Sequence, residues 1–153
     1  MASSRNIKND TLATSEMCNI WRKMLNENIS IFCHEGGKSE MVAINILGIC
    51  SKDDDNTSFQ VKSKDLSDMF MVMKYAEEKF NVFNYYGVEK YVTDFGLSVQ
   101  QNFRKKGIAT EMLKVRITLM QLLDINLTST VFTGLGAQIA AKKIGFEENF
   151  SIT

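Results

Sequence analysis

The sequence lacks a net charge and lacks a long hydrophobic run. Its 18 basic residues balance 18 acidic residues, so no overall field attracts nucleic acid or an anionic membrane surface. Residues 1–6 are polar, and the longest apolar stretch, residues 41–50, is interrupted by Asn45 and is too short to cross a bilayer. We therefore expect a cytoplasmic protein without a membrane or nucleic-acid partner, in which any anion is bound by a local site.

Cysteine and histidine are also scarce. The three cysteines, Cys18, Cys33 and Cys50, have no metal-like spacing and leave an odd count, which is typical of reduced, buried thiols rather than of a disulfide framework. His34 is the only histidine, and it follows an apolar run instead of standing beside a nucleophile or a second ligand. These scarcities argue against a metal site and against a serine-type triad.

What the chain does contain is enough apolar material for one core. A length of 153 residues with 44% hydrophobic and 24% charged residues fits a single folded domain over residues 1–153. Hydrophobic periodicity predicts helices over about 15–26, 66–80, 108–122 and 137–144, and strands over 29–33, 41–49, 90–99 and 126–132. This order predicts an α/β (α+β) domain with a mixed central sheet flanked by helices.

Three local patterns refine this outline. Gly36 and Gly37 favour a hairpin between the first two strands. Residues 51–63, with acidic residues at 53–55, indicate a solvated loop rather than a metal site. The helix over 108–122 is expected to bury an apolar stripe formed by Ile108, Met112, Val115, Leu119 and Leu122.

A basic, glycine-containing turn joins the strand over 90–99 to the helix over 108–122. The start of a helix presents unpaired N–H groups and the positive end of the helix dipole to an anion. Gly107 allows the backbone to approach such an anion closely, and Arg104, Lys105 and Lys106 attract phosphate oxygens. A diphosphate fits this arrangement, although the short string alone also fits a solvated helix start.

In its context this string resembles a motif of the Gcn5-related N-acetyltransferase superfamily, in which R/Q-x-x-G-x-G/A binds the pyrophosphate of coenzyme A. Gly107 and Ala109 occupy the two small positions. Residues 127–134 and 140–146 look like the corresponding parts of the insect arylalkylamine (dopamine) N-acetyltransferases. The resemblance implies an acetyltransferase fold that uses acetyl-CoA as co-substrate and no metal. The residues that it places against the coenzyme are Leu97, Ser98, Val99, Arg104, Lys105, Lys106, Gly107, Ile108, Ala109 and Thr110.

The resemblance also implies a reaction, in which a neutral primary amine attacks the acetyl thioester directly. The implied substrates are small arylalkylamines of the dopamine, tyramine, octopamine, tryptamine or serotonin type. Alkylammonium groups titrate at about 10, so a base or a water chain has to remove a proton first. In the insect enzymes a glutamate serves as this base, and the segment that carries it would lie upstream of Met1.

Two residues of this chain are candidates for catalytic roles. Asp94 lies on the motif-bearing strand, but a regular strand would place Asp94 and Val99 on opposite faces, so a role as base requires a bulge between them. A hydrogen-bonded structural aspartate is the alternative. Thr133 matches a position where relatives place a hydroxyl near the sulfur.

The family pattern extends beyond both ends of residues 1–153. Its first strand and helix and its last strands have no counterpart here, so we expect a chain truncated at both ends, with a fold that is incomplete at the first and last strands. Two functions therefore stay open: an arylalkylamine N-acetyltransferase with a small-molecule amine substrate, and a non-catalytic coenzyme A-binding or protein-interaction domain. The oligomeric state stays open as well.

Overall fold

The structure is a computed structural model that describes residues 9–54 and 60–152. The polar start at residues 1–6 and the middle of the loop over 51–63, including Asp55, fall outside the described residues, so the predictions made for them are not tested. The remaining residues form the helices α1 (Thr11–Leu25), α2 (Lys64–Lys79), α3 (Val82–Tyr86), α4 (Ile108–Leu122) and α5 (Leu135–Lys143), the strands β1 (Ile31–His34), β2 (Met41–Ser51) and β3 (Lys90–Val99), and the short 3₁₀ helix η1 (Gln101–Phe103).

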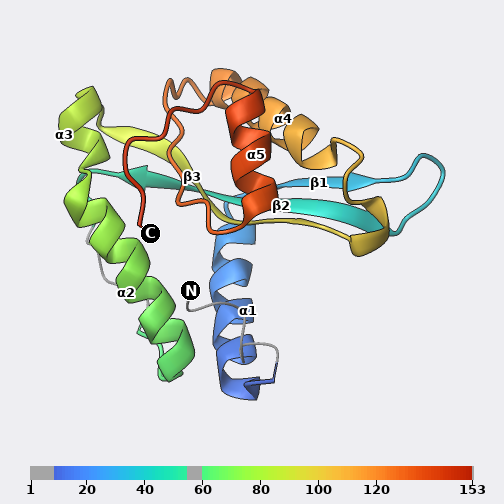
Figure 1. The fold of residues 1–153 in the computed structure, drawn as a ribbon, viewed down its shortest axis with the longest axis horizontal. Helices are drawn as coiled ribbons and strands as arrows, with labels where there is room; N and C mark the ends of the chain where they lie inside the picture. Colours follow the sequence, from blue (N-terminus) through green and yellow to red (C-terminus); the bar gives the residue numbers. More distant parts are fainter. Residues whose placement is uncertain (1–8, 55–59, 153) are drawn as a thin grey trace.

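The three strands form an antiparallel sheet in the order β1-β2-β3. Helices α1 and α2 lie on one side of this sheet and α4 and α5 on the other, as Figure 1 shows. The predicted hairpin, the strand over 90–99 and the α/β architecture are confirmed. The predicted strand over 126–132 is wrong in extent, because only a single parallel bridge between Val92 and Thr128 forms there.

Helix α1 begins earlier than the apolar periodicity predicts. Asp10 is its N-cap, and its carboxylate accepts hydrogen bonds from the N–H groups of Leu12 and Ala13. A side chain that satisfies two of the orphan N–H groups allows the helix to start at Thr11, ahead of its first apolar stripe residues.

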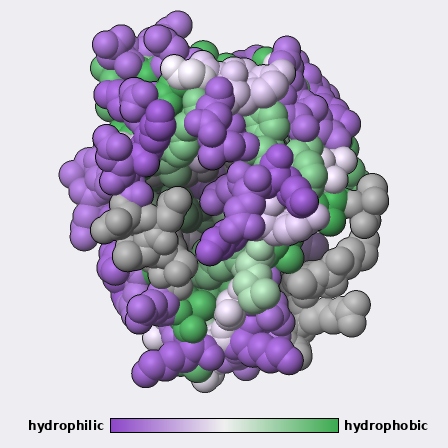
Figure 2. All heavy atoms as spheres, turned by 90° about the vertical axis from the view of Figure 1, so that its left-hand side faces the viewer, coloured by the Kyte–Doolittle hydropathy of each residue, from purple (hydrophilic) through white to green (hydrophobic). Residues whose placement is uncertain are grey.

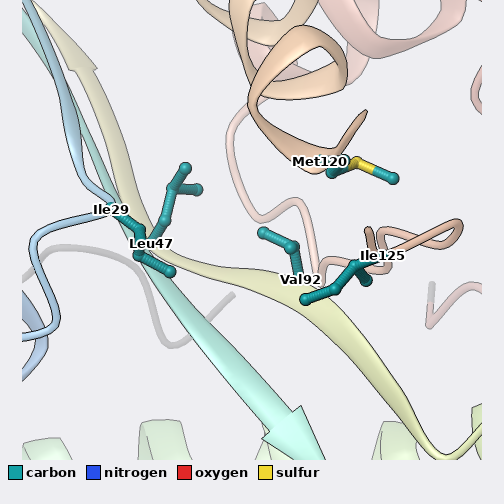
Figure 3. Packing of buried hydrophobic residues seen from close by; sticks show 5 residues of the cluster. All are labelled: Ile29, Leu47, Val92, Met120 and Ile125. Carbon is teal, nitrogen blue, oxygen red and sulfur yellow. The ribbon is translucent and has the colours of Figure 1, made fainter. Parts of the chain in front are cut away.

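The core lies on both faces of the sheet. On the α4 side, Ile29, Leu47, Val92, Met120 and Ile125 pack together, as Figure 3 shows. Ala13, Ile20 and Leu66 form a second cluster between α1 and α2. A third cluster of Leu113, Ala140 and Ala141 joins α4 to α5. Burial on both faces fixes β2 and β3 between two helical layers.

The buried face of α4 differs from the predicted stripe. Its buried residues are Met112, Leu113, Arg116 and Met120, whereas Val115 is 47% exposed and Leu122 is 81% exposed. Apolar residues surround much of this helix, so periodicity alone did not fix which face turns inward. The inward face is the one that carries an arginine.

The outer surface of α2 and α3 is mostly hydrophilic, with hydrophobic atoms visible between the polar side chains (Figure 2). Met71, Tyr75 and Tyr85 are among the exposed large hydrophobic residues there. Within the described ranges, no helix has the length and hydropathy that a bilayer-crossing segment needs. The three cysteines are free and half-buried, so they are less buried than predicted.

Candidate functional site

Helix α4 begins at the basic turn, and its N-cap is Gly107. Gly107 has a φ of 80°, in the left-handed region that favours glycine, and a Cβ added there would meet no atom within 4 Å. No side chain caps this helix start. The N–H groups of Ile108, Ala109 and Thr110, in the first turn, therefore have no helical carbonyl to bond and face outward along the helix axis.

The start of α4 differs in this respect from the starts of the first three helices. Asp10, Ser63 and Asn81 each accept hydrogen bonds from first-turn N–H groups of α1, α2 and α3. A glycine N-cap without a side-chain acceptor leaves the N–H groups of α4 available to an anion from outside the chain.

The three basic residues before Gly107 are exposed and directly precede the helix start. Lys105 has a φ of 61°, which is rare for a residue other than glycine. The Nε group of Arg104 donates to the carbonyl of Val99 at 2.9 Å. The Lys106 ammonium lies 5.1 Å from the centre of the Phe103 ring. Three cations and a free helix start thus meet at the end of β3.

The last residues of β3 present main-chain groups to an open edge. The N–H of Gln100 donates to the carbonyl of Val42 at 2.9 Å, and the register pairs Val99 with Ala43. Because hydrogen-bonded and non-bonded positions alternate in an antiparallel pair, the N–H and C=O groups of Leu97 and Val99 point away from β2. The bond from Arg104 to the Val99 carbonyl agrees with this direction.

On that open side, β3 parts from the segment that follows α4. At Val92 the two are joined, because the N–H of Val92 donates to Leu127 and the N–H of Ser129 donates to Val92, each at 3.0 Å. Beyond this bridge no backbone hydrogen bond joins β3 to the residues around Thr130 within the described chain. The outward main-chain groups of Leu97 therefore have no backbone partner in this segment.

A β-bulge at Phe95 separates the two halves of β3. The register with β2 shifts between Ile46 and Leu47, which pair with Gly96 and Asp94, so Phe95 is the additional residue. The indole N–H of Trp21 donates to the Phe95 carbonyl at 2.9 Å. This bulge puts the main-chain groups of Leu97 and Val99, rather than those of Ser98, on the open edge, and it is the bulge that a catalytic role for Asp94 would require.

Asp94 itself is held in a buried ion pair with Arg116 of α4. Its other contacts are the side-chain amide of Asn45, at 3.1 Å, and the N–H of Gly96, at 3.2 Å. The Asp94 side chain is 8% exposed. A carboxylate that already accepts these bonds is poorly suited to remove a proton from an amine, and the arrangement favours the structural alternative given above.

Thr133 is not among the residues hydrogen-bonded in this cluster. It is exposed and immediately precedes Gly134, the N-cap of α5. Its side chain makes no hydrogen bond to the part of the chain that the structure describes. The catalytic role of Thr133 stays a prediction.

Sequence patterns missed two residues of the site, Arg116 and Asn45, which are fully buried. The guanidinium of Arg116 makes five contacts: two with the amide oxygen of Asn45, one with Asp94, and one each with the hydroxyls of Thr128 and Thr130. Burial lowers the pKa of Arg116, and the charge of Asp94 opposes that effect. A basic residue four positions from both Met112 and Met120, and an amide inside an apolar strand, were the signals available in the sequence.

No protein-family model and no curated protein sequence matches the chain. Among solved structures, a putative arylalkylamine N-acetyltransferase 7 of the yellow fever mosquito matches with a TM-score of 0.91 and 35% identity, over 95% of this chain and 61% of that chain. Arylalkylamine N-acetyltransferase 2 of Aedes aegypti matches with a TM-score of 0.79 and 20% identity, over 86% and 62%. A predicted acetyltransferase of Clostridium acetobutylicum with acetyl-CoA matches with a TM-score of 0.59 and 15% identity, over 95% and 75%.

The chain has the Gcn5-related N-acetyltransferase fold. Its structural neighbours are insect arylalkylamine N-acetyltransferases, so the resemblance drawn from the residues around Gly107 is confirmed. The chain spans about three fifths (61%) of the length of the putative arylalkylamine N-acetyltransferase 7. In this acetyltransferase fold, the free start of α4 and the open edge of β3 adjoin each other.

Proposed function

We propose that the chain binds acetyl-CoA, with the diphosphate at the start of α4 and the acetyl-pantetheine arm along the open edge of β3. The observation that carries this proposal is that two sets of main-chain groups without a hydrogen-bond partner in the described chain lie next to each other. They are the uncapped N–H groups that follow Gly107, and the outward N–H and C=O groups of Leu97 with the outward N–H of Val99. One set suits an anion, and the other suits an extended chain of amides.

The two parts of the coenzyme match the two parts of the site in charge. The diphosphate carries negative charge, and the three exposed cations of residues 104–106 directly precede the helix start without an acidic residue among them. The pantetheine arm is neutral and carries amide groups, and the edge residues Leu97 and Val99 are half-buried and uncharged. A structural neighbour of this fold has been determined with acetyl-CoA.

The proposed reaction is transfer of the acetyl group to a primary amine. The amine nitrogen bonds to the thioester carbon, the carbon–sulfur bond breaks, and the thiolate leaves with a proton from the attacking nitrogen. Hydrogen-bond donors at the thioester oxygen stabilise the charge that develops there. The outward N–H groups of Leu97 and Val99 are the candidate donors on this chain.

We propose arylalkylamines of the dopamine, tyramine, octopamine, tryptamine or serotonin type as substrates. The support is the 35% identity to a structure named as a putative arylalkylamine N-acetyltransferase. Because Asp94 is paired with Arg116, we assign deprotonation of the amine to water or to a group other than Asp94. Coenzyme binding without turnover is the second candidate function, and the ion pair of Asp94 is the observation that favours it.

The test has two stages. Calorimetric titration of the chain with coenzyme A is expected to show saturable binding, and acetyl-CoA consumption is then measured with each amine and with no amine. Amine-dependent release of thiol supports transfer, whereas binding with no amine-dependent release supports the second candidate. The absence of binding at millimolar coenzyme A would remove both.

A further inference from the structure

Arg116 reaches from α4 to three neighbouring parts of the sheet. Its Nε and Nη2 groups donate to the Asn45 oxygen of β2, at 3.1 and 2.8 Å. Nη2 also contacts Asp94 of β3. Nη1 donates to the hydroxyls of Thr128 and Thr130 in the segment after α4, at 3.4 and 2.9 Å. Since a guanidinium carries five N–H groups in a rigid plane, all of its donors are used.

This guanidinium lies where β3 and the following segment part. The hydroxyl of Thr128 donates to the Val92 carbonyl at 2.8 Å, beside the last backbone hydrogen bonds between the two. Thr130 lies two residues after Thr128, and Asp94 lies two residues after Val92. Between these two residues the Arg116 guanidinium forms the link, in place of backbone hydrogen bonds. A planar group with fixed donors holds its partners at a set separation.

The same network shapes the bulge. Asp94 accepts from the N–H of Gly96, and the side-chain amide of Asn45 donates to the Gly96 carbonyl at 3.0 Å. Arg116 in turn holds both Asp94 and Asn45. Gly96 has a φ of 149°, and its two main-chain groups are thus fixed by side chains that Arg116 orients.

We propose that Arg116 is a positioning residue: it holds β3 at a fixed separation from residues 128–130 and thereby positions the outward edge of β3 on which the pantetheine arm of the coenzyme would bind. It touches neither the coenzyme nor the amine. The inference rests on the proposed function and adds to it the residue that fixes the geometry of the open edge. Loss of this positioning would therefore weaken binding of the pantetheine arm but leave the proposed diphosphate site at Gly107 unchanged.

That distinction gives the experiment. Two ligands are titrated by calorimetry: coenzyme A, which carries the arm, and adenosine 3′-phosphate 5′-diphosphate, which carries the nucleotide and the diphosphate alone. The variants are Arg116→Lys, which keeps the charge but loses the planar set of donors, and Thr130→Val, which removes one acceptor with little change in size. Thr93→Val is the matched control, because Thr93 lies on β3 beside Asp94 with its side chain on the opposite face.

Arg116→Lys and Thr130→Val are expected to raise the Kd of coenzyme A by on the order of 3- to 30-fold, and to leave the Kd of the nucleotide within about twofold of the unchanged chain. Thr93→Val is expected to change neither. A melting curve of each variant shows that it is folded, and Leu66→Ala, in the cluster between α1 and α2, shows what loss of stability alone does to both Kd values.

The outcomes separate the two proposals. If the unchanged chain binds neither ligand, the proposed function fails and this inference with it. If it binds both, and the variants keep its ratio of the two Kd values, only the role of Arg116 fails. An equal loss of affinity for both ligands would show that Arg116 contributes only to general stability. The same loss of affinity in Leu66→Ala would show this too, and either result overturns the proposal. If Arg116→Lys does not fold, Thr130→Val decides alone.

Discussion

The proposed diphosphate site depends on the backbone conformation of Gly107. Its φ of 80° is costly for a β-branched residue, and the space in front of it is open. We expect Gly107→Val to weaken coenzyme A binding roughly tenfold or more, because the left-handed region costs a residue other than glycine about 1–2 kcal/mol and the new side chain fills the approach to the helix start. Calorimetric Kd values measure this.

Lys114→Ala is the matched control for that substitution. Lys114 lies on the exposed side of α4, where it pairs with Glu111, and an exposed ion pair contributes little to stability. The Kd is therefore expected to change less than twofold. Equal losses in the two variants would show that the anion site lies elsewhere.

At the same scale, Asn45 and Arg116 show what the sequence pattern did not reveal. Each stands inside an apolar run, and periodicity treats such a residue as an interruption rather than as half of a pair. The two are 71 positions apart, and only the fold brings them together. Their mutual satisfaction is what makes burial of a charge tolerable. The backbone motif at Gly107 was predictable because its residues are neighbours in the sequence. The Arg116 network was not, because its residues come from distant parts of the sequence.

At the scale of elements, the strands and helices that border the site followed from the sequence. Strand β3 and helix α4 have the predicted bounds, residues 90–99 and 108–122, because their apolar periods are long and a turn with Gly107 separates them. The segment over 126–132 has the composition of a strand, but only the bridge between Val92 and Thr128 joins it to β3. Whether these residues form a strand depends on pairing with the neighbouring strand rather than on local propensity.

The caps of α1 and α2 are coupled, and this coupling has a consequence for pH. Ser63, the N-cap of α2, donates its hydroxyl to Asp10 at 2.9 Å, and Asp10 caps α1. Hydrogen bonds from Ala13, Ser63 and Leu12 lower the pKa of Asp10 from its ordinary value of 3.8. A carboxylate with a folded pKa below its unfolded pKa adds stability above the unfolded value, and that stability is lost as the pH falls through the folded pKa.

Asp10→Ala is therefore expected to lower the melting temperature at neutral pH and to differ less from the unchanged chain below a pH of about 3.8. Asp10→Asn is the companion variant, because asparagine caps helices about as well as aspartate but does not titrate. It is expected to retain most of the melting temperature at neutral pH. Melting curves followed by circular dichroism from pH 2.5 to 7 measure both. A constant difference between Asp10→Ala and the unchanged chain over that range would contradict the assigned linkage.

At the scale of the whole molecule, the sheet separates an apolar core layer from the layer that carries the Arg116 network. Helices α1 and α2 fill one face with the Ala13, Ile20 and Leu66 cluster, and the other face carries the Arg116 network together with α4 and α5. The proposed coenzyme site lies at the end of the molecule where β3 passes into α4 (Figure 1). A ligand there would contact groups from β3 and from the start of α4, so it would tie a strand to a helix.

A ligand that binds the folded chain alone raises its stability by mass action. Acetyl-CoA at about 100 times its Kd is expected to add about 2.7 kcal/mol to the free energy of unfolding. For a chain of this length that corresponds to a rise of roughly 5–10 °C in melting temperature. Gly107→Val, measured at the same acetyl-CoA concentration, is expected to show a much smaller rise, because its Kd is higher. An unchanged melting temperature of the unmutated chain at millimolar acetyl-CoA would show that the uncapped start of α4 and the open edge of β3 do not together form a coenzyme site.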